Sequence, residues 1–476
     1  MKRFILSLGV VFGLMCSLSF AQNTKIWTLQ ECLDYAMKNN IGLQQNQLQQ
    51  QISAVNLLSA KAARYPNLNV GPQWSSSFGR SIDPTTNTFI DQRFDALNIS
   101  ANSNVTLWNN NRITNTIKQR EMDLEASEKD VKQAEYDLAL DVTLAYLNIL
   151  FQGEILESAR VQVLSTREQL DRTSKLVQAG SLAQADLAQV QSQIATEELN
   201  VVNAQNQLEL AYLALQQLLL LDPEEPFGIQ KPELADPQGG FRLTPTSEIY
   251  SSAIGFQPSI EAADLRIKSA SLGEKIAEAS MYPTVSLGVT AFTAWSGGRL
   301  QQNGTAMVRD TITAEIAQQE QTFVLLGERP TFGSYPFFNQ LIDNYNVGLG
   351  LRIDIPIYNR RQVKSQIEIA QIQTSQAKLT AQLVRQSLQQ LIEQAYVDAR
   401  NALSTYSATQ KQVEALELTF DNIQKQFDLG AANSVDFLVA KNNLNQSKFD
   451  LLRAKYGYFF RLKILDFYQG KPIDFE

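Results

Sequence analysis

The 476-residue chain contains no histidine and only two cysteines, Cys16 and Cys32. Without histidine, neither a Ser-His-Asp nor a Cys-His catalytic arrangement is possible, and zinc sites with histidine ligands are excluded. No phosphate-binding loop and no pairing of a nucleophile with a base is recognisable either. We therefore expect a protein that is not an enzyme and that carries no cofactor and no metal site.

The chain begins with the pattern of a secretory signal peptide. Residues 1–3 are Met-Lys-Arg, an apolar run follows over residues 4–20, and small side chains at Ser19 and Ala21 predict cleavage after Ala21. A retained membrane anchor is one alternative, but the short apolar run and the cleavage site favour removal. Acylation at Cys16 is another, which the large methionine before this cysteine disfavours.

Removal of residues 1–21 leaves 39 basic and 49 acidic residues, a net charge near −10, and a single cysteine. An intrachain disulfide is then impossible, and no nucleic-acid partner is expected, because binding to phosphates needs basic patches. No later segment approaches the roughly twenty apolar residues of a transmembrane helix. If the exported protein enters a membrane, we expect it to do so with strands.

The sequence consists of two copies of one plan. Residues 60–71, AKAARYPNLNVG, match residues 277–288, AEASMYPTVSLG, at a shift of 217. From the second strand of each copy onward the shift is 250. Pairs at this shift include Trp108 with Tyr358, Gly180 with Gly430, and Asp186 with Asp436. The difference of 33 residues predicts an insertion between the strands of the second copy.

These shifts and the composition divide the chain into parts. They are a signal peptide at 1–21, a first repeat at 22–221, a Pro- and Gly-rich linker at 222–245, a second repeat at 246–468 with an extracellular-loop insert at about 296–344, and a C-terminal tail at 469–476. Each repeat is expected to contain a helix, a strand, a loop, a second strand, a very long helix, a tight turn and a last helix. The first helix is predicted at 28–64, and the strand pairs at 67–76 with 97–107 and at 284–295 with 345–357.

The long helices carry apolar residues at every seventh position. In the first copy these are Val142, Ile149, Leu156, Val163, Leu170 and Val177, and at the shift of 250 they are Ile392, Ala399, Tyr406, Val413, Phe420 and Phe427. This period indicates coiled-coil packing. A helix over residues 111–178 would be about 100 Å long at about 1.5 Å per residue, which is longer than an ordinary core helix needs to be.

The predicted strands alternate apolar and polar side chains. Within 345–357, Leu351 and Ile353 lie on one face, and Arg352 and Asp354 lie on the other. Strands of about eleven residues with this alternation are typical of outer-membrane barrels, although half-buried strands of a soluble sheet alternate as well. Aromatic residues favour the membrane, because they lie at both ends of the strands, as the two membrane interfaces select. These aromatics are Tyr65, Trp108, Tyr282 and Tyr358 beside the helices, and Trp74 and Trp295 near the opposite ends.

Four strands cannot close into a barrel, and an open edge in lipid leaves backbone groups unpaired. Several chains must therefore share one barrel. Two chains would supply eight strands, whose interior is filled by side chains, whereas three would supply twelve and leave a channel. In such a barrel Arg352 and Asp354 face a water-filled lumen, and the apolar residues face lipid.

In this order, the motifs resemble the TolC family of outer-membrane efflux proteins over essentially the whole chain after the signal. The resemblance rests on the duplicated helix–Tyr-Pro–strand unit, the strand-to-helix junctions TLWNNNR and PIYNRRQ, and the turns LVQAGSLAQADLAQVQ and FDLGAANSVDFLVAKN. It implies a mainly α fold with membrane β-structure: a homotrimer with a shared twelve-stranded transmembrane β-barrel in the outer membrane and a long coiled-coil α-helical barrel in the periplasm. It also implies two partners, a periplasmic adaptor (membrane fusion) protein and an inner-membrane pump of the resistance-nodulation-division, ABC or a similar type.

The resemblance also assigns roles to the turns. It implies that Gly180 and Gly430 lie at periplasmic tips where the adaptor docks, although a helix end with left-handed backbone needs glycine in any case. It implies that Asp436 lines the tunnel mouth, and Asp186 has the equivalent place in the first copy. A second aspartate of the family pattern is replaced by Val439. Both aspartates also suit the first turn of a helix, where the helix dipole stabilises negative charge.

The sequence thus predicts the exit duct of a tripartite efflux or secretion system in the outer membrane. The duct is expected to be passive and water-filled, and to be opened at its periplasmic end by its partners. The alternative is a soluble periplasmic coiled-coil scaffold that uses its sheets for assembly and has no channel activity.

Overall fold

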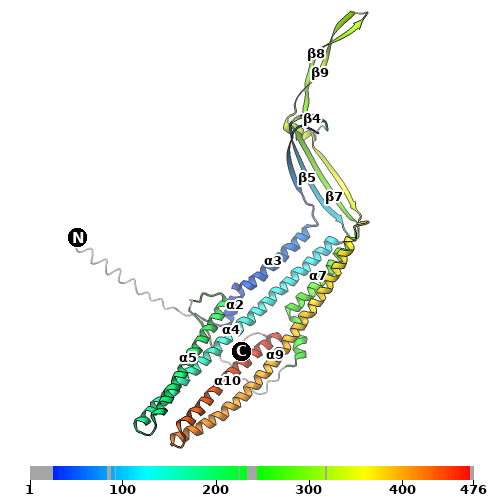
Figure 1. The fold of residues 1–476 in the computed structure, drawn as a ribbon. Helices are drawn as coiled ribbons and strands as arrows, with labels where there is room; N and C mark the ends of the chain where they lie inside the picture. The colour runs from blue at the N-terminus through cyan, green and yellow to red at the C-terminus, as the bar shows by residue number, and fades with distance from the viewer. Residues whose placement is uncertain are drawn as a thin grey trace, which may run out of the picture. The chain divides into compact units, whose positions relative to one another are not determined.

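The computed structural model describes residues 25–82, 87–91, 93–223, 226–232, 244–316 and 319–471 (Figure 1). The predicted signal peptide with Cys16, part of the predicted linker and the last residues of the predicted tail lie outside the described residues. The chain divides into two compact units. The first contains residues up to 54, 123–267 and 376 onward, and the second contains residues 55–122 and 268–375.

The helices of the two copies correspond to one another. The pairs are α2 (Leu29–Asn39) with α6 (Thr246–Phe256), α3 (Ile41–Ala62) with α7 (Pro258–Ala279), α4 (Arg112–Gln178) with α9 (Gln362–Asp428), and α5 (Gln184–Leu219) with α10 (Ser434–Tyr468). The first two pairs begin at the shift of 217 and the last two at the shift of 250, so the structure confirms the duplication. Helices α4 and α9 both have 67 residues, which confirms the two very long helices.

The single helix predicted at 28–64 is wrong, because it consists of two helices that meet at Asn40. Asn40 has extended backbone, with φ −62° and ψ 124°, and its Oδ1 accepts a hydrogen bond of 3.1 Å from the backbone N–H of Leu43. In the second copy the corresponding break lies at Gln257, before Pro258, whose ring disfavours helical backbone in the preceding residue. The first copy lacks this proline, so the break was overlooked.

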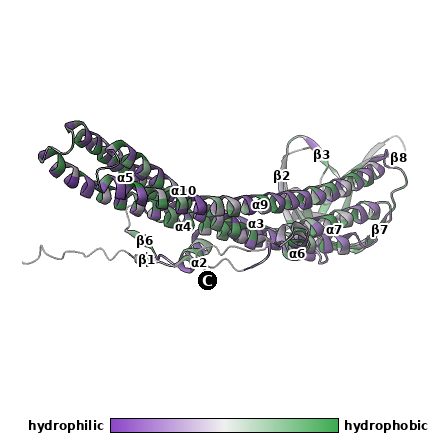
Figure 2. Cartoon of the chain, turned by 90° about the horizontal axis from the view of Figure 1, so that it is seen from below, coloured by the Kyte–Doolittle hydropathy of each residue, from purple (hydrophilic) through white to green (hydrophobic). Residues whose placement is uncertain are grey.

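The seven-residue positions are buried in the same way in both long helices. The first four are at most 7% exposed in each: Val142, Ile149, Leu156 and Val163 in α4, and Ile392, Ala399, Tyr406 and Val413 in α9. The last two positions of each helix are half-buried. Polar and apolar residues alternate along the long helices (Figure 2), as expected for helices that pack on one side and meet water on another.

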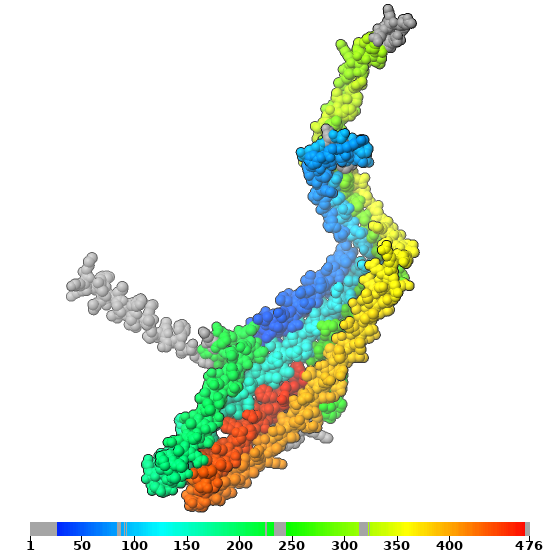
Figure 3. Space-filling model, viewed as in Figure 1, coloured from blue at the N-terminus to red at the C-terminus, as the bar shows by residue number. Residues whose placement is uncertain are grey.

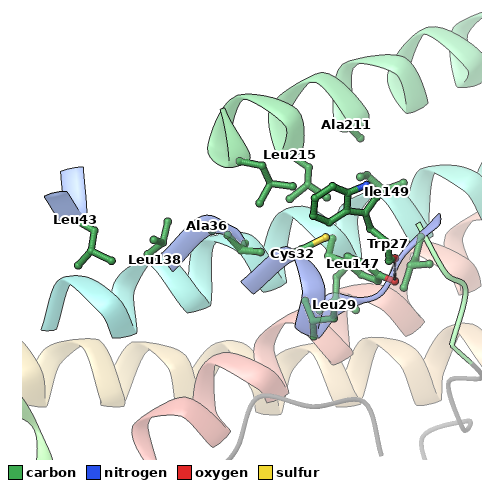
Figure 4. Close-up of a cluster of buried hydrophobic side chains, with 14 of the residues drawn as sticks. Trp27, Leu29, Cys32, Ala36, Leu43, Leu138, Leu147, Ile149, Ala211 and Leu215 are labelled. Atoms are coloured by element: carbon green, nitrogen blue, oxygen red, sulfur yellow. Dashed lines mark hydrogen bonds between the residues drawn. The ribbon is translucent and has the colours of Figure 1, made fainter. Parts of the chain in front are cut away.

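One apolar cluster of the first unit joins elements that are distant in the sequence (Figure 4). Val142 and Ile149 of α4 pack with Cys32 of α2 and Leu215 of α5. Trp27 joins them from β1 (Lys25–Trp27), a short strand that pairs in parallel with β6 (Phe227–Ile229). Each large apolar side chain buried here contributes about 2 kcal/mol, so packing in this cluster holds the short helix against the long one.

The second unit contains a four-stranded antiparallel sheet in the order β10-β7-β5-β2. The strands are β2 (Asn69–Ser77), β5 (Phe94–Trp108), β7 (Thr284–Ser296) and β10 (Asn346–Asp354). Both predicted strand pairs are confirmed, and pairing of β5 with β7 joins the two copies. Strand β10 ends at Asp354, so Ile355, Pro356 and Ile357 lie beyond the strand that was expected to contain them.

The insert expected at about 296–344 has regular structure of its own. Strands β8 (Leu300–Ile316) and β9 (Gln319–Ser334) form a long hairpin, and α8 (Phe337–Asp343) follows it. The β-branched residues of the insert favour strands, despite its Gly, Asn and Pro content. A smaller hairpin, β3 (Arg80–Ile82) with β4 (Phe89–Asp91), lies at the corresponding place between β2 and β5.

The expectation that no segment after the signal peptide is long and apolar enough to cross a membrane as a helix is wrong for α4. Within the described residues it contains an 18-residue window with a mean hydropathy of 1.2, of which 39% is buried inside the protein. Length and composition alone would allow this helix to span a bilayer. Apolar residues of α4, such as Leu147, however pack in the cluster with α2 and α5, as in the core helices of soluble proteins.

Candidate functional site

The four-stranded sheet has one predominantly apolar face, interrupted by Ser103 on β5 and Thr293 on β7. Its register places apolar residues opposite one another on β10 and β7: Val347 with Ala291, Leu349 with Val289, Leu351 with Leu287, and Ile353 with Val285. The same rows continue through Val105 on β5 and Val70 on β2. The four β10 residues are 52–73% exposed, so the chain itself does not cover this face. A large exposed apolar surface marks contact with another protein or with a membrane.

The other face of the sheet carries small and polar side chains. Arg352 is opposite Ser286, and Asp354 is opposite Thr284, so both charged residues lie on the face away from the aliphatic rows. Both are exposed, at the end of β10 that leads into α9. The structure therefore confirms the alternation from which the lumen residues were predicted.

The interface aromatics lie near the two ends of the sheet. Trp74 and Trp295 share one row, and their rings stack with centroids 5.6 Å apart. At the opposite ends, Tyr65, Trp108, Tyr282 and Tyr358 are 46–86% exposed. Trp108 pairs with Val285, ten residues from Trp295 along β7, which is about 33 Å at about 3.3 Å per residue. In a strand tilted by about 40°, the rows would lie about 25 Å apart across the membrane, the height of the apolar band of outer-membrane barrels.

Among the described residues nothing pairs with the two outer edges of the sheet, one on β10 and one on β2. Each edge presents backbone N–H and C=O groups without ladder partners, and lipid cannot supply any. Because four antiparallel strands alternate in direction, β10 of one chain and β2 of another run antiparallel when placed side by side. The two edges of nine residues each can therefore continue one sheet from chain to chain.

The two turns that join the long helices to the last helices have the same geometry. Gly180 and Gly430 have φ of 75° and 74°, a left-handed conformation that glycine adopts without steric cost. In the first turn, the N–H of Ser181 donates to the C=O of Leu176, and the N–H of Gly180 donates to the C=O of Val177. The second turn repeats both bonds. This Schellman arrangement satisfies the last carbonyls of each long helix and explains both glycines structurally.

The two aspartates that follow the turns have different surroundings. Asp186 accepts a hydrogen bond of 3.0 Å from the backbone N–H of Ala183, and its other oxygen accepts one from the hydroxyl of Ser434. Asp436 is exposed, and its backbone N–H donates to Oδ1 of Asn433 at 2.8 Å. Asp186 thus caps the first turn of α5 and also connects this helix to the second turn. Of the two aspartates, Asp436 is the one exposed to solvent.

Polar side chains join the α4–α5 hairpin to the α9–α10 hairpin near the turns, which lie side by side in Figure 3. Arg172 of α4 forms an ion pair of 2.9 Å with Asp428 of α9. Gln193 of α5 and Asn442 of α10 exchange two amide hydrogen bonds, of 2.9 and 3.2 Å. These contacts belong to one chain and hold its two hairpins together.

A lysine and a glutamate are buried in this contact. Lys441 of α10 is 4% exposed, and its Nζ donates to the hydroxyl of Thr166 at 2.9 Å. Burial lowers the pKa of Lys441, while Glu197 and Glu168 oppose the shift. Glu197 of α5 is 3% exposed and accepts hydrogen bonds from Gln162 and Gln193 on one oxygen, while its other oxygen has no partner among the described groups.

This buried pair was not predicted from the sequence, although the spacing of apolar residues along α5 indicates it. The buried positions of α5 include Val190, Glu197, Ala204 and Ala211, which are spaced by seven. A charged residue at such a position is expected to lie inside the coiled coil. The seven-residue spacing along α5 therefore predicts that Glu197 is buried.

The described residues include no group of three or more His, Cys, Asp or Glu side chains that could hold a metal ion. Many carboxylates form exposed ion pairs along the helices, such as Arg167 with Glu198 at 2.8 Å. Such pairs contribute at most about 1 kcal/mol.

A family model described as "Outer membrane efflux protein" matches residues 32–219 and 249–459, one stretch in each copy. Among curated proteins, the outer membrane efflux protein BepC of Brucella suis is 21% identical, over 90% of this chain and 82% of its own length. The outer membrane protein TolC of Escherichia coli is 22% identical, over 95% of this chain and 83% of its own length.

Solved structures with the same fold include those of CusC and VceC. CusC, described in terms of folding and transmembrane channel formation, has a TM-score of 0.73 at 19% identity and covers 93% of this chain and 92% of its own. VceC, an outer membrane protein of Vibrio cholerae, has a TM-score of 0.73 at 16% identity and covers 94% of this chain and 97% of its own. At these identities the likeness establishes the fold.

Proposed function

The chain belongs to the outer membrane efflux protein family, and we propose that three copies of it form the passive exit duct of a tripartite efflux or secretion system. Members of this family are channels rather than enzymes, placed in the outer membrane with a helical tunnel in the periplasm. This membership decides against the soluble scaffold that the sequence analysis kept as an alternative.

The observation that carries the proposal is the incomplete sheet. It has an uncovered apolar face, aromatic rows at a membrane-like spacing and two unpaired edges of opposite direction. Three such sheets joined β10 to β2 would make a closed barrel of twelve antiparallel strands, which is wide enough for water. The aliphatic rows would then face lipid, and Arg352 and Asp354 would face the lumen.

Gating is assigned to the turns. Adaptor and pump partners would bind around Gly180 and Gly430 and separate the two hairpins, which the contacts near the turns hold together in the resting state. Asp436, the solvent-open carboxylate after the second turn, is proposed to line the tunnel mouth. The path stays passive, because the energy for transport comes from the inner-membrane pump.

The test is to purify the chain from outer membranes in mild detergent and to measure mass and conductance. Native mass spectrometry is expected to find three chains, and a planar bilayer is expected to show discrete single-channel currents. A monomer that passes no current would refute the proposal. A trimer without current would retain the assembly but reject the open bore.

A further inference from the structure

In the part of the chain that the structure describes, no further strand pairs with the long insert hairpin β8–β9. It pairs from Leu300 with Ser334 to Ile316 with Gln319, and both of its outer edges are unpaired in the described sheet. A lone hairpin is at best marginally stable in water, and long free edges attract further strands. The hairpin therefore needs a third strand, or another surface, on at least one edge.

The composition of the hairpin also points to a partner. Val324, Leu325 and Leu326 follow one another on β9 and are 50–61% exposed. Neighbouring residues of a strand point to opposite faces, so both faces of the hairpin carry aliphatic groups. Val324 and Leu326 share one face with Met307, and Leu325 shares the other with Ile312. A hairpin that stood alone in water would be expected to keep at least one face polar.

The base of the hairpin is fixed to the end of β7. The backbone N–H of Gly297 donates to the C=O of Asp95 at 2.8 Å. The side-chain amide of Gln340, 1% exposed, bonds both the N–H and the C=O of Ser296, at 2.9 and 3.0 Å, as a neighbouring strand would. Arg299 stacks on Tyr335, 5.0 Å from the ring centroid. These contacts set the direction of the hairpin at its base, which lies at the end of β7 away from α7.

We propose that the partner is a second copy of this chain, with β9 of one copy pairing edge to edge with β8 of the next. The inference rests on the proposed trimer. Within each hairpin β8 and β9 run in opposite directions. In a threefold ring, β9 of each copy therefore lies antiparallel to β8 of the next copy. The same contact repeats between successive copies until the ring closes. Both unpaired edges are then satisfied at once.

Three paired hairpins make a wall of six strands at the outer end of the duct. A closed barrel of eight strands is already filled by its own side chains, so six strands leave no water-filled bore. The hairpins of the three copies therefore close the outer mouth, and cargo passes only when they separate. Among the described residues only the second copy carries a long hairpin, because β3 and β4 of the first copy have three residues each, so each chain contributes one long hairpin.

Cross-linking between differently tagged copies tests the pairing. One copy carries Thr311→Cys and the other Val324→Cys, both in a Cys32→Ser background, and a short bismaleimide tolerates a shift in register. Separate copies are needed because residues 311 and 324 are opposite each other within one hairpin. A covalent dimer that carries both tags is expected.

A matched pair of variants reports the barrel itself. Val347→Cys and Val70→Cys lie on the two outer strands of the sheet, in one row. If this pair links and the hairpin pair does not, the inference is overturned while the duct stands. If neither pair links, the proposed barrel fails with it.

Conductance tests the closure. Residues 300–334 can be replaced by a short Gly-Ser turn, because the N–H of Tyr335 already bonds the C=O of Arg299 at 3.3 Å. This variant and a milder one, with residues 324–326 changed to threonine, are expected to raise the single-channel conductance several-fold without loss of the trimer. Unchanged conductance in both variants would show that the hairpins do not close the mouth.

Discussion

Arginine substitutions at two neighbouring positions of β7 test which face of the sheet meets lipid. Val289 lies on the apolar face opposite Leu349, and Thr290 lies on the polar face opposite Gly348. Both side chains are exposed in the single chain. Val289 is four residues from Val285 and six from Trp295, or about 13 and 20 Å along the strand. It therefore lies near the middle of the apolar band.

Val289→Arg should be far more costly than Thr290→Arg. An arginine at the bilayer midplane of an outer-membrane barrel costs about 2–4 kcal/mol, and three chains would add this cost to about 6–12 kcal/mol per trimer if the sites are independent. Thr290→Arg would place the same charge in the lumen, where water solvates it, at a cost of about 1 kcal/mol or less.

Assembly in lipid vesicles measures the difference. The yield of heat-dissociable trimer and its midpoint in guanidinium chloride should fall sharply for Val289→Arg and little for Thr290→Arg. Equal losses at both positions would refute the membrane orientation of the sheet. A larger loss for Thr290→Arg would reverse it.

Three further outcomes are expected in the helical unit. Gly430→Ala should lower the free energy of unfolding by about 1–2 kcal/mol, because residue 430 has left-handed backbone. No atom lies within 4 Å of an added Cβ, so a clash would not contribute. The urea midpoint should fall, and an unchanged midpoint would contradict the turn geometry. Ser434→Ala removes a hydrogen bond to the Asp186 carboxylate, which is worth about 1.5–3 kcal/mol. Hydrogen exchange of the backbone amides around the two turns should therefore become faster. Unchanged exchange rates would mean that this bond does not hold the two hairpins together. Because burial lowers the pKa of Lys441, the unfolded chain binds this proton more tightly than the folded chain, and the free energy of unfolding should rise as pH rises from the lowered value toward 10.5. Lys441→Met combined with Glu197→Gln should abolish that rise in thermal melts, while Lys441→Met alone should destabilise the chain, since it leaves a buried carboxylate without a nearby cation.

Much of the fold follows from patterns that repeat along the chain. The shifts of 217 and 250 predict corresponding helices, the alternation around Leu351 predicts the faces of β10, and the seven-residue spacing predicts the buried stripes of α4 and α9. Each of these patterns depends on whether a side chain meets solvent, which the residue types themselves record.

The remaining features depend on contacts that periodicity does not encode. The break at Asn40 depends on one side-chain hydrogen bond, and the bond from Ser434 to Asp186 joins residues 248 apart in the sequence. The hairpin of the insert carries exposed apolar residues on both faces, so its sequence lacks the alternation that predicts the strands of the sheet. The pairing of Lys441 with Thr166 needs the packing of two hairpins, and no local pattern in either segment contains it.

The duplication has a consequence for how partners can attach. The two turns of one chain have almost the same backbone geometry, with glycine φ angles one degree apart. A ring of three chains would therefore present six nearly equal binding sites at its turns, whereas the insert, which only one repeat of each chain carries, would occur three times. A partner with sixfold symmetry could therefore bind the turns of the same trimer whose inserts would suit a partner with threefold symmetry.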